Sequence, residues 1–453
     1  MSSEPGHRAH GLELVSYTDV AGSPVFKLAM QVVDDRWYLY ATHFWEPRLS
    51  VIDVTDPAAP ELVAYTDVAG SPVFKLAMQV VDDRWYLYAT HFWEPRLSVI
   101  DVTDPAAPEL VATIEGPERT ATWQVQVADG ILVQGLEHIP VPWGGDPAAP
   151  GDEGVRLYDV SDPRNPTLLS HWRTGEHGVH RNHYTGGRYV HLAASQPGFD
   201  GNIYVILDIE DPASPRPVGR WFVPEQFVAA GARPERRISL HGPAYVAGDR
   251  AYLPYGAAGL VVLDISDVTA PRQVSRLEIG AAFSSTIAMH TAIPRPERGL
   301  VLVNTEAIAE RTQEPYNFAG IVDVSDETAP RLTSLLPIPV PDEDAGYANF
   351  SLRGGRFGPH NQHHPQDSPH LFDSERLLFL TWFNAGLRVY DVADPHLPRE
   401  VASFLPDDPA ERRGLLPKDL VTQSEDVLVD ARGYIYLSDK NHGLHILTMP
   451  GLV

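Results

Sequence analysis

The chain has 453 residues, 43% of them apolar, and a formal net charge of −25. This acidic balance excludes a nucleic-acid partner, since proteins that bind the phosphate backbone present a basic face. The absence of Cys excludes disulfides, thiolate metal ligands and a cysteine nucleophile.

The N-terminal segment MSSEPGHRAH contains no apolar stretch of the kind found in secretory signals. We expect residues 1–10 to form a disordered tail and residues 11–453 to form a single domain. No later segment approaches the roughly 18 apolar residues that a membrane-spanning helix requires. These features predict a cytoplasmic protein without a membrane span.

A short phrase recurs along the chain, an apolar strand ending in Asp and followed by a turn built on Asp-Pro or a close variant. Its first aspartate falls at Asp53, Asp101, Asp159, Asp208, Asp264, Asp323 and Asp391, a spacing of 48 to 68 residues. Repeats at this spacing are typical of solenoids and propellers.

The first complete unit contains four segments rich in Val, Ile, Tyr and Trp, separated by Asp, Glu and Pro. They are Val25–Val33, Trp37–Thr42, Leu49–Val54 and Glu61–Tyr65. None has the period of a helix. Four antiparallel strands per unit predict an all-β propeller blade, with Pro tolerated at its outer edge.

The two ends of the chain match different strands of one blade. GLELVSYTD, beginning at Gly11, resembles the fourth-strand text PELVAYTD, whereas GLHILTMPG, beginning at Gly443, resembles a third strand. We therefore expect Leu12–Asp19 to pair beside Leu444–Met449 and to close the ring. This count predicts eight blades.

Residues 17–64 and 65–112 are identical over all 48 positions, which indicates a very recent duplication. The duplicated length is one whole blade in frame. An eight-bladed ring is expected because a looped-out copy would leave its apolar strand faces unburied. A seven-bladed ring with one copy looped out is the alternative.

The phrases SVIDVTDP, RLYDVSDP and RVYDVADP resemble the signature of the LVIVD-repeat β-propellers over essentially the whole chain. The resemblance implies the fold. It implies no single activity, because propellers carry many unrelated functions.

Four consecutive units place histidine at the start of the innermost strand, where one mouth of the central channel is expected. The segments GVHRNHY, SLHGPAY, AMHTAIP and FGPHNQHHP contribute His180, His241, His290 and His360. Imidazole is a common metal ligand, and a set without Cys suits iron, copper or zinc. His183, His363 and His364 are alternates for a neighbouring ligand.

This arrangement resembles the carotenoid cleavage oxygenases, propellers whose non-haem iron is held by four histidines with carboxylates behind them. The resemblance implies His180, His241, His290 and His360 as ligands. It also implies Glu306, Glu425 and Asp426 as carboxylates that orient the imidazoles. A purely structural role remains open, because an axial His can hydrogen-bond a neighbouring strand and spread by duplication.

The sequence also predicts positions for two other histidines and a role for three insertions. His43 and His91 are expected at the surface or at strand ends. The insertions at residues 135–154, 224–235 and 336–358 exceed what blade turns need and are expected to shape a binding mouth. Aromatic residues that would line this mouth are Trp143, Phe227, Tyr347, Phe350, Phe357 and Trp382.

Three functions are compatible with these features. The first is a metal-dependent oxidoreductase, a mononuclear non-haem iron oxygenase that acts with O2 on an apolar or aromatic small molecule. Copper and zinc are the alternative metals. The second is a hydrolase or lyase that uses water bound to the same metal. The third is a metal-free propeller that serves as a scaffold for protein binding.

Overall fold

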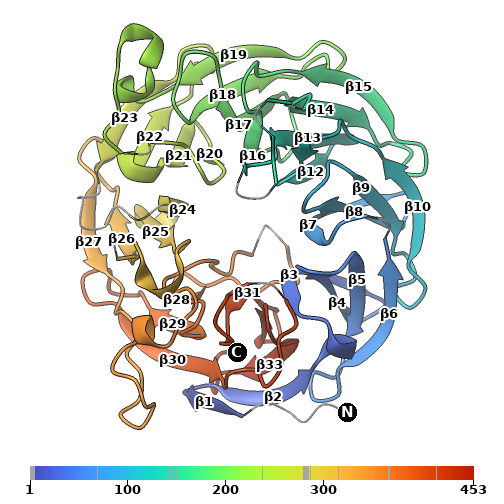
Figure 1. Ribbon diagram of the computed structural model, residues 1–453, viewed down its shortest axis with the longest axis vertical. Coiled ribbons are helices and arrows are strands. Elements are labelled where there is room, and N and C mark those ends of the chain that lie inside the picture. The colour runs from blue at the N-terminus through green and yellow to red at the C-terminus, as the bar shows by residue number, and fades with distance from the viewer. Residues whose placement is uncertain are drawn as a thin grey trace.

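Eight antiparallel sheets form a ring around a central axis (Figure 1). The computed structural model describes residues 6–68, 70–141, 144–146, 148–149, 151–236, 238–278, 285, 287–314, 316–365, 368–414 and 416–453. Within these residues there is no α-helix, only strands and short 3-10 turns. The predicted all-β propeller of eight blades is confirmed. Both identical copies form complete four-stranded sheets, so neither is looped out.

Blades are numbered here in chain order, beginning with the first duplicated copy. Blades 1 to 4 contain the strands β3 (Val25–Val33), β4 (Arg36–His43), β5 (Arg48–Asp53) and β6 (Glu61–Asp67); β7 (Val73–Val81), β8 (Arg84–His91), β9 (Leu97–Asp101) and β10 (Glu109–Ile114); β11 (Thr120–Ala121), β12 (Val125–Ala128), β13 (Ile131–His138), β14 (Gly154–Asp159) and β15 (Thr167–Trp172); and β16 (Val179–His183), β17 (Tyr189–Ser195), β18 (Asn202–Asp208) and β19 (Arg216–Trp221).

Blades 5 to 8 contain β20 (Tyr245–Ala247), β21 (Arg250–Pro254), β22 (Leu260–Asp264) and β23 (Arg272–Leu277); β24 (Ile287–Arg295), β25 (Leu300–Glu306), β26 (Ala319–Asp323) and β27 (Arg331–Leu335); β28 (Leu377–Thr381), β29 (Leu387–Asp391) and β30 (Arg399–Pro406); and β31 (Ser424–Val429), β32 (Tyr434–Asp439) and β33 (Leu444–Thr448). The 3-10 turns are η1 (Val20–Gly22), η3 (Pro224–Gln226), η4 (Val228–Ala230), η5 (Gly256–Ala258), η7 (Pro296–Arg298), η8 (Glu310–Thr312) and η9 (Phe350–Leu352).

Blade 7 has no regular inner strand. In its place, the His360 backbone N–H donates to the Thr381 carbonyl at 2.9 Å, and the His363 N–H donates to the Phe379 carbonyl at 3.0 Å. The chain therefore follows β28 closely enough to fill the inner position of the blade. Blade 3 also departs from the predicted pattern, because its first segment is divided into β11 and β12, which both pair with β13.

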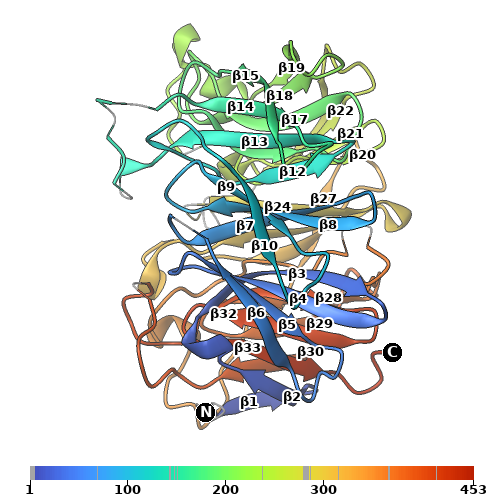
Figure 2. The same ribbon diagram turned by 90° about the vertical axis from the view of Figure 1, so that its right-hand side faces the viewer.

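The N-terminus closes the ring through two strands (Figures 1 and 2). β2 (Glu13–Thr18) pairs antiparallel with β33, with Glu13 opposite Thr448, which confirms the predicted closure. The predicted tail at residues 1–10 is corrected at its C-terminal end, because β1 (His7–His10) pairs with β30 of blade 7. Residues 1–5 lie outside the described residues.

Gly11 makes the sharp turn between β1 and β2. Its φ of +65° is a conformation that residues with a Cβ rarely adopt. A Cβ there would lie 2.8 Å from the Val401 carbonyl oxygen. Leu12, the next residue, is buried in the core between blades 7 and 8 together with Phe404 and Leu447. Apolar packing therefore holds the turn in place, which the polar composition of the tail does not reveal.

The repeated phrase owes its form to hydrogen bonds made by its two aspartates. In blade 1 the Thr55 N–H donates to Asp53 at 2.8 Å and the Ala58 N–H donates to Asp56 at 3.0 Å. The first aspartate accepts such a bond in all seven phrases. The phrase is thus a pair of side-chain-capped turns joining the third and fourth strands.

These seven aspartates predict a loss of stability in acid. The pKa of each is lowered. At Asp264, for example, hydrogen bonds from the Ser266 hydroxyl and amide lower the pKa to about 2. A lowered folded-state pKa stabilises the fold above the unfolded value of about 3.9 and ceases to do so below the folded value.

We therefore expect the free energy of unfolding, measured by urea titration, to fall steadily from about pH 4 to about pH 2. The variant Asp101→Asn should show a shallower fall. Burial works to raise the pKa of Asp101, but bonds from Thr103 and Arg84 lower it to about 2. A stability that does not change across this interval would contradict the prediction.

Candidate metal centre

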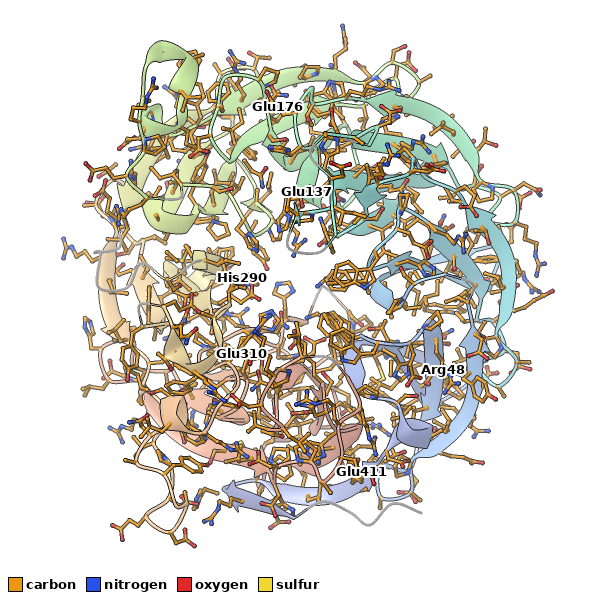
Figure 3. All side chains as sticks on the ribbon, in the orientation of Figure 1. Arg48, Glu137, Glu176, His290, Glu310 and Glu411 are labelled. Atoms are coloured by element: carbon orange, nitrogen blue, oxygen red, sulfur yellow. The ribbon has the colours of Figure 1, made fainter. Side chains whose placement is uncertain are left out.

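The inner strands pair irregularly with their neighbours near their N-terminal ends, where the residues closest to the ring axis lie. The register shifts between Val179 and Arg181 in β16, between Ile287 and Thr291 in β24, and between Ser424 and Asp426 in β31. β-bulges of this kind redirect a side chain and are common beside functional sites. His180, His290 and Glu425 lie within these irregularities. Figure 3 shows His290 at the inner edge of the ring.

The four predicted histidines form a row across blades 4 to 7. The ring centroids of His180 and His241 are 4.4 Å apart, those of His241 and His290 are 5.5 Å apart, and those of His290 and His360 are 5.5 Å apart. The structure thus brings together all four side chains that were expected at one mouth of the channel.

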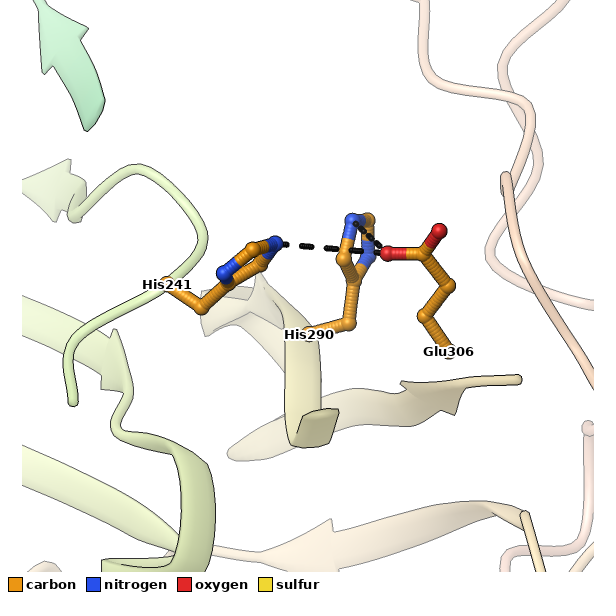
Figure 4. A group of neighbouring side chains, drawn as sticks. All are labelled: His241, His290 and Glu306. Atoms are coloured by element: carbon orange, nitrogen blue, oxygen red, sulfur yellow. Dashed lines mark ion pairs between the residues drawn. The ribbon is translucent and has the colours of Figure 1, made fainter. Parts of the chain in front are cut away.

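Glu306, the last residue of β25, lies among three of these imidazoles rather than behind them. Its carboxylate oxygens are 3.4 Å from His290 Nε2, 4.0 Å from His241 Nε2 and 3.6 Å from His360 Nε2. His241, His290 and Glu306 each offer one donor atom, and these three atoms all lie within 4.8 Å of one another (Figure 4). Glu306 was expected to orient the ligands, but its position makes it a candidate ligand itself.

Two further carboxylates contact the Nδ1 atoms of the first and last histidines of the row. Glu137 Oε2 is 2.8 Å from His180 Nδ1, and Glu425 Oε1 is 3.1 Å from His360 Nδ1. Burial opposes ionisation of Glu425, but Lys440 and His360 outweigh it and lower the Glu425 pKa. Such carboxylates fix the tautomer and orientation of a ligating imidazole. The Glu425 contact agrees with the role expected for it, and Glu137 was missed.

Asp426 does not contact the four imidazoles in the described hydrogen bonds and ion pairs. Its Oδ1 is 3.0 Å from Lys27 Nζ, and its Oδ2 accepts the Leu28 N–H at 3.3 Å. The structure therefore gives Asp426 the role of partner to a buried cation, in place of the expected one.

Burial keeps His290 in the form that binds metals. Burial, and then the neighbouring His360, Arg181, Lys75 and Lys27, hold the pKa of His290 well below its usual range. A neutral imidazole has a lone pair free for coordination. Its Nδ1 lies 2.7 Å from Thr291 Oγ1, while its Nε2 faces Glu306.

The alternate histidines lie outside the row. His363 Nε2 is 2.7 Å from the Phe372 carbonyl, and its Nδ1 accepts the Val429 N–H at 3.2 Å. Burial lowers the His363 pKa to about 4. Both of its nitrogens are therefore used in structural bonds. His183 lines a separate pocket of about 400 Å³ with His191, and His364 lies beside Tyr245.

His43 and His91 are strand-end residues as expected, but they are fully buried rather than on the surface. His43 Nδ1 lies 3.0 Å from the Pro24 carbonyl and Nε2 lies 2.9 Å from Ser50 Oγ. Both nitrogens of this imidazole are thus occupied by structural bonds, as the corresponding ones of His91 are.

Aromatic residues occupy blades 1 to 3 where histidines occupy blades 4 to 7. Phe26, Phe74 and Trp123 begin or precede the inner strands and form one buried cluster with Phe44 and Phe92. The insertion aromatics expected at the mouth instead lie in the core, as Tyr347, Phe350, Phe357 and Trp382 do, or pack with other rings, as Phe227 does. Trp143 lies outside the described residues.

Cations complete the site. Lys27, Lys75, Arg181 and Lys440 lie around the same end of the inner strands. A simple signal could have found the lysines: the chain has only four, Lys27, Lys75, Lys418 and Lys440, against 31 arginines. Lys27 and Lys75 hold the same inner-strand position because their copies are identical, and Lys440 follows the second strand of blade 8.

The fold and this cluster define a β-propeller with a histidine–carboxylate group at its axis. A family model described as the LVIVD repeat matches residues 244–278, which contain all four strands of blade 5. This match confirms the LVIVD-repeat resemblance. None of the curated proteins matches the sequence.

Solved propellers resemble the chain over nearly its whole length. Sqt1 of Chaetomium thermophilum, solved bound to the N-terminus of a ribosomal protein, has a TM-score of 0.60 at 11% identity, covering 96% of this chain and 99% of Sqt1. BamB from Moraxella catarrhalis has a TM-score of 0.51 at 10% identity, with the same coverage of 96% and 99%. At such identities the likeness concerns the fold alone. In the described part of the chain, no helix is long and apolar enough to span a bilayer.

Proposed function

We propose that the protein is a metal-dependent oxidoreductase whose single ion is bound by His241, His290 and Glu306. The observation that carries this proposal is the convergence of two imidazoles and one carboxylate, with donor atoms within 4.8 Å of one another. Two His and one carboxylate with open positions form the ligand set of non-haem Fe(II) oxygenases. Fe(II) is therefore the favoured metal, and Cu and Zn are the alternatives.

The closest pair of donor atoms has the spacing of two ligands of one ion, whereas His241 Nε2, 4.0 Å from Glu306, would have to move closer. Two ligand atoms that each lie about 2.1 Å from one metal, at tetrahedral or octahedral angles, are about 3.0–3.4 Å apart. The 3.4 Å between His290 Nε2 and Glu306 Oε2 agrees with this spacing. It also exceeds the usual length of a hydrogen bond. His180 and His360 adjoin the three residues and would complete or support the set, with Glu137 and Glu425 orienting them.

The surrounding residues favour an apolar or aromatic small molecule as substrate. Blades 1 to 3 lie across the ring from blades 5 and 6 (Figure 1). Phe26, Phe74 and Trp123, at the start of their inner strands, belong to one buried aromatic cluster. Such rings bind apolar ligands and exclude water. When bound, Fe(II) would supply O2 activation, while the side chains of the site hold the metal, orient the imidazoles and seat the substrate.

Elemental analysis of protein purified without chelator tests the metal. We expect about one iron per chain, and the variants His241→Ala and Glu306→Gln should each lower metal affinity by about tenfold or more. His183→Ala is the matched control, since His183 lies in the separate pocket. It should retain the metal, and thermal unfolding should change little in all three variants.

The outcomes separate the competing functions. Iron together with O2 uptake supports the oxygenase. Stoichiometric zinc without O2 uptake would favour the metal-dependent hydrolase or lyase at the same residues. Wild-type protein without stoichiometric metal would contradict the proposal and favour a scaffold that binds another protein.

A further inference from the structure

Lys75 differs from the other lysines at the axis. Lys27 Nζ is 3.0 Å from Asp426 Oδ1, and Lys440 Nζ is 2.9 Å from Glu425 Oε2. The Lys75 ammonium takes part in none of the ion pairs or hydrogen bonds found among the described residues. Lys418, the fourth lysine, is exposed. Lys75, which is half-buried, is therefore left without a carboxylate partner among the described ion pairs.

The duplication explains this difference. Lys27 and Lys75 hold the same position in identical copies, and their N–H groups donate to Thr42 Oγ1 and Thr90 Oγ1, both at 2.9 Å. In blade 8 the equivalent position is Asp426, whose N–H donates to Ser438 Oγ at 3.0 Å. Lys27 is thus preceded around the ring by Asp426, but Lys75 is preceded by Lys27. The copy repeats the lysine without its partner.

Burial and the neighbouring cations disfavour a positive charge on Lys75. Burial first, and then the charges of Lys27 and Arg181, hold the pKa of Lys75 well below its usual range, although Asp426 and Glu425 act in the opposite direction. Its Nζ lies 5.5 Å from the Phe74 ring centre. The Phe74 ring is 4.8 Å from Phe92 and 5.8 Å from Trp123, centre to centre. Lys75 is therefore an amine beside an apolar, aromatic wall.

We propose that Lys75 is a carbonyl-reactive amine that captures an apolar or aromatic aldehyde or ketone as an imine at the ring axis. A lysine desolvated beside another cation is activated as a nucleophile because its free amine is populated near neutral pH. The Nζ lone pair attacks the carbonyl carbon and forms a C–N bond. The carbonyl oxygen then leaves as water with the two amine hydrogens. The reaction needs no oxidant, and it does not depend on the proposed metal.

Trapping with benzaldehyde and cyanoborohydride tests the proposal on the full chain. Reduction turns the imine into a stable benzylamine, and labelled lysines resist trypsin. Lys27 then falls in a peptide of residues 9–36 and Lys75 in one of residues 49–84, so the identical copies are distinguished. At about pH 6, where an ordinary lysine of pKa about 10.4 is almost wholly protonated, Lys75 should be labelled at least about tenfold faster than Lys27 or Lys418.

A charge exchange provides the matched variants. Lys27→Asp places a carboxylate before Lys75, as Asp426 stands before Lys27, and should lower Lys75 labelling by about tenfold or more. Asp426→Asn removes the partner of Lys27 and should raise Lys27 labelling instead. Circular dichroism and thermal unfolding verify that both variants fold, and Asp426→Asn keeps the test decisive if Lys27→Asp does not fold.

Equal labelling of Lys75 and Lys27 in the wild type would overturn the proposal. So would strong binding of benzoate without any trapped benzaldehyde, since Lys75 would then be an anion site. Labelling of metal-free and iron-loaded protein should be alike, which separates this result from the test of the metal centre.

Discussion

Removal of residues 1–18 is expected to unfold the whole ring rather than one blade. The deletion takes away β2, the outer strand of blade 8, and β1, which extends blade 7. It also removes Leu12 from the core between these blades. Burial of one Leu contributes about 1.5–3 kcal/mol and each hydrogen bond about 0.5–1.5 kcal/mol. Their sum is a large part of the 5–15 kcal/mol typical of a folded domain.

Shorter deletions serve as controls in thermal and urea unfolding. Deleting residues 1–5 leaves both strands intact and should have little effect. Deleting residues 1–10 removes β1 alone and should give an intermediate loss, because β2 still completes blade 8. Unchanged unfolding after the deletion of residues 1–18 would show that the ring does not depend on this closure.

Deletion of one 48-residue copy is expected to leave a soluble, folded ring of seven blades. Because the copies are identical, removal of residues 17–64 or of 65–112 yields the same protein. The candidate ligands His241, His290 and Glu306 lie in blades 5 and 6, so metal content should remain about one ion per chain. The remaining copy would follow blade 8 directly, and its lysine would meet Asp426 as Lys27 does.

Chromatography, circular dichroism and elemental analysis of the deletion variant test these points. The deletion variant keeps one lysine at the position shared by Lys27 and Lys75. Trapping of benzaldehyde by this lysine should fall to the level of Lys27 in the full chain. An insoluble or unfolded product would show that the eighth blade is required for ring closure.

Local chemistry made the fold readable from the sequence. Asp and Pro at fixed places in each phrase mark the capped turn between the third and fourth strands, and seven occurrences set the period. The ends of the chain resemble two strands that pair, so the closure was readable too. β1 was not, because His7–His10 has no apolar pattern and is held by the backbone of β30 and by Leu12 beyond the turn.

From the sequence, the site could be predicted mainly at one position that repeats at the start of the inner strands. The histidines could be found because four blades carry them in nearly the same column. Glu306 was expected only to orient them and Glu137 was missed, because both come from second strands and their direction depends on the twist of neighbouring blades. Read across all eight blades, the same column also holds Phe26, Phe74 and Trp123. These aromatic residues, and the pairing of Lys27 with Asp426, have no counterpart in the histidine pattern and were not predicted from it.

The two N-terminal strands, β1 and β2, also limit the order in which the ring can form. Glu13 of β2 cannot pair until Thr448 of β33 has been synthesised, 435 residues later in the chain. Until then β2 has no partner, although β1 can already pair with β30, and the ring remains open beside blade 8. Contacts so distant in sequence form slowly, and unpaired edges invite association with other chains. Closure of the ring is thus a late step in folding, and the need for a chaperone should be greatest before β33 has been synthesised.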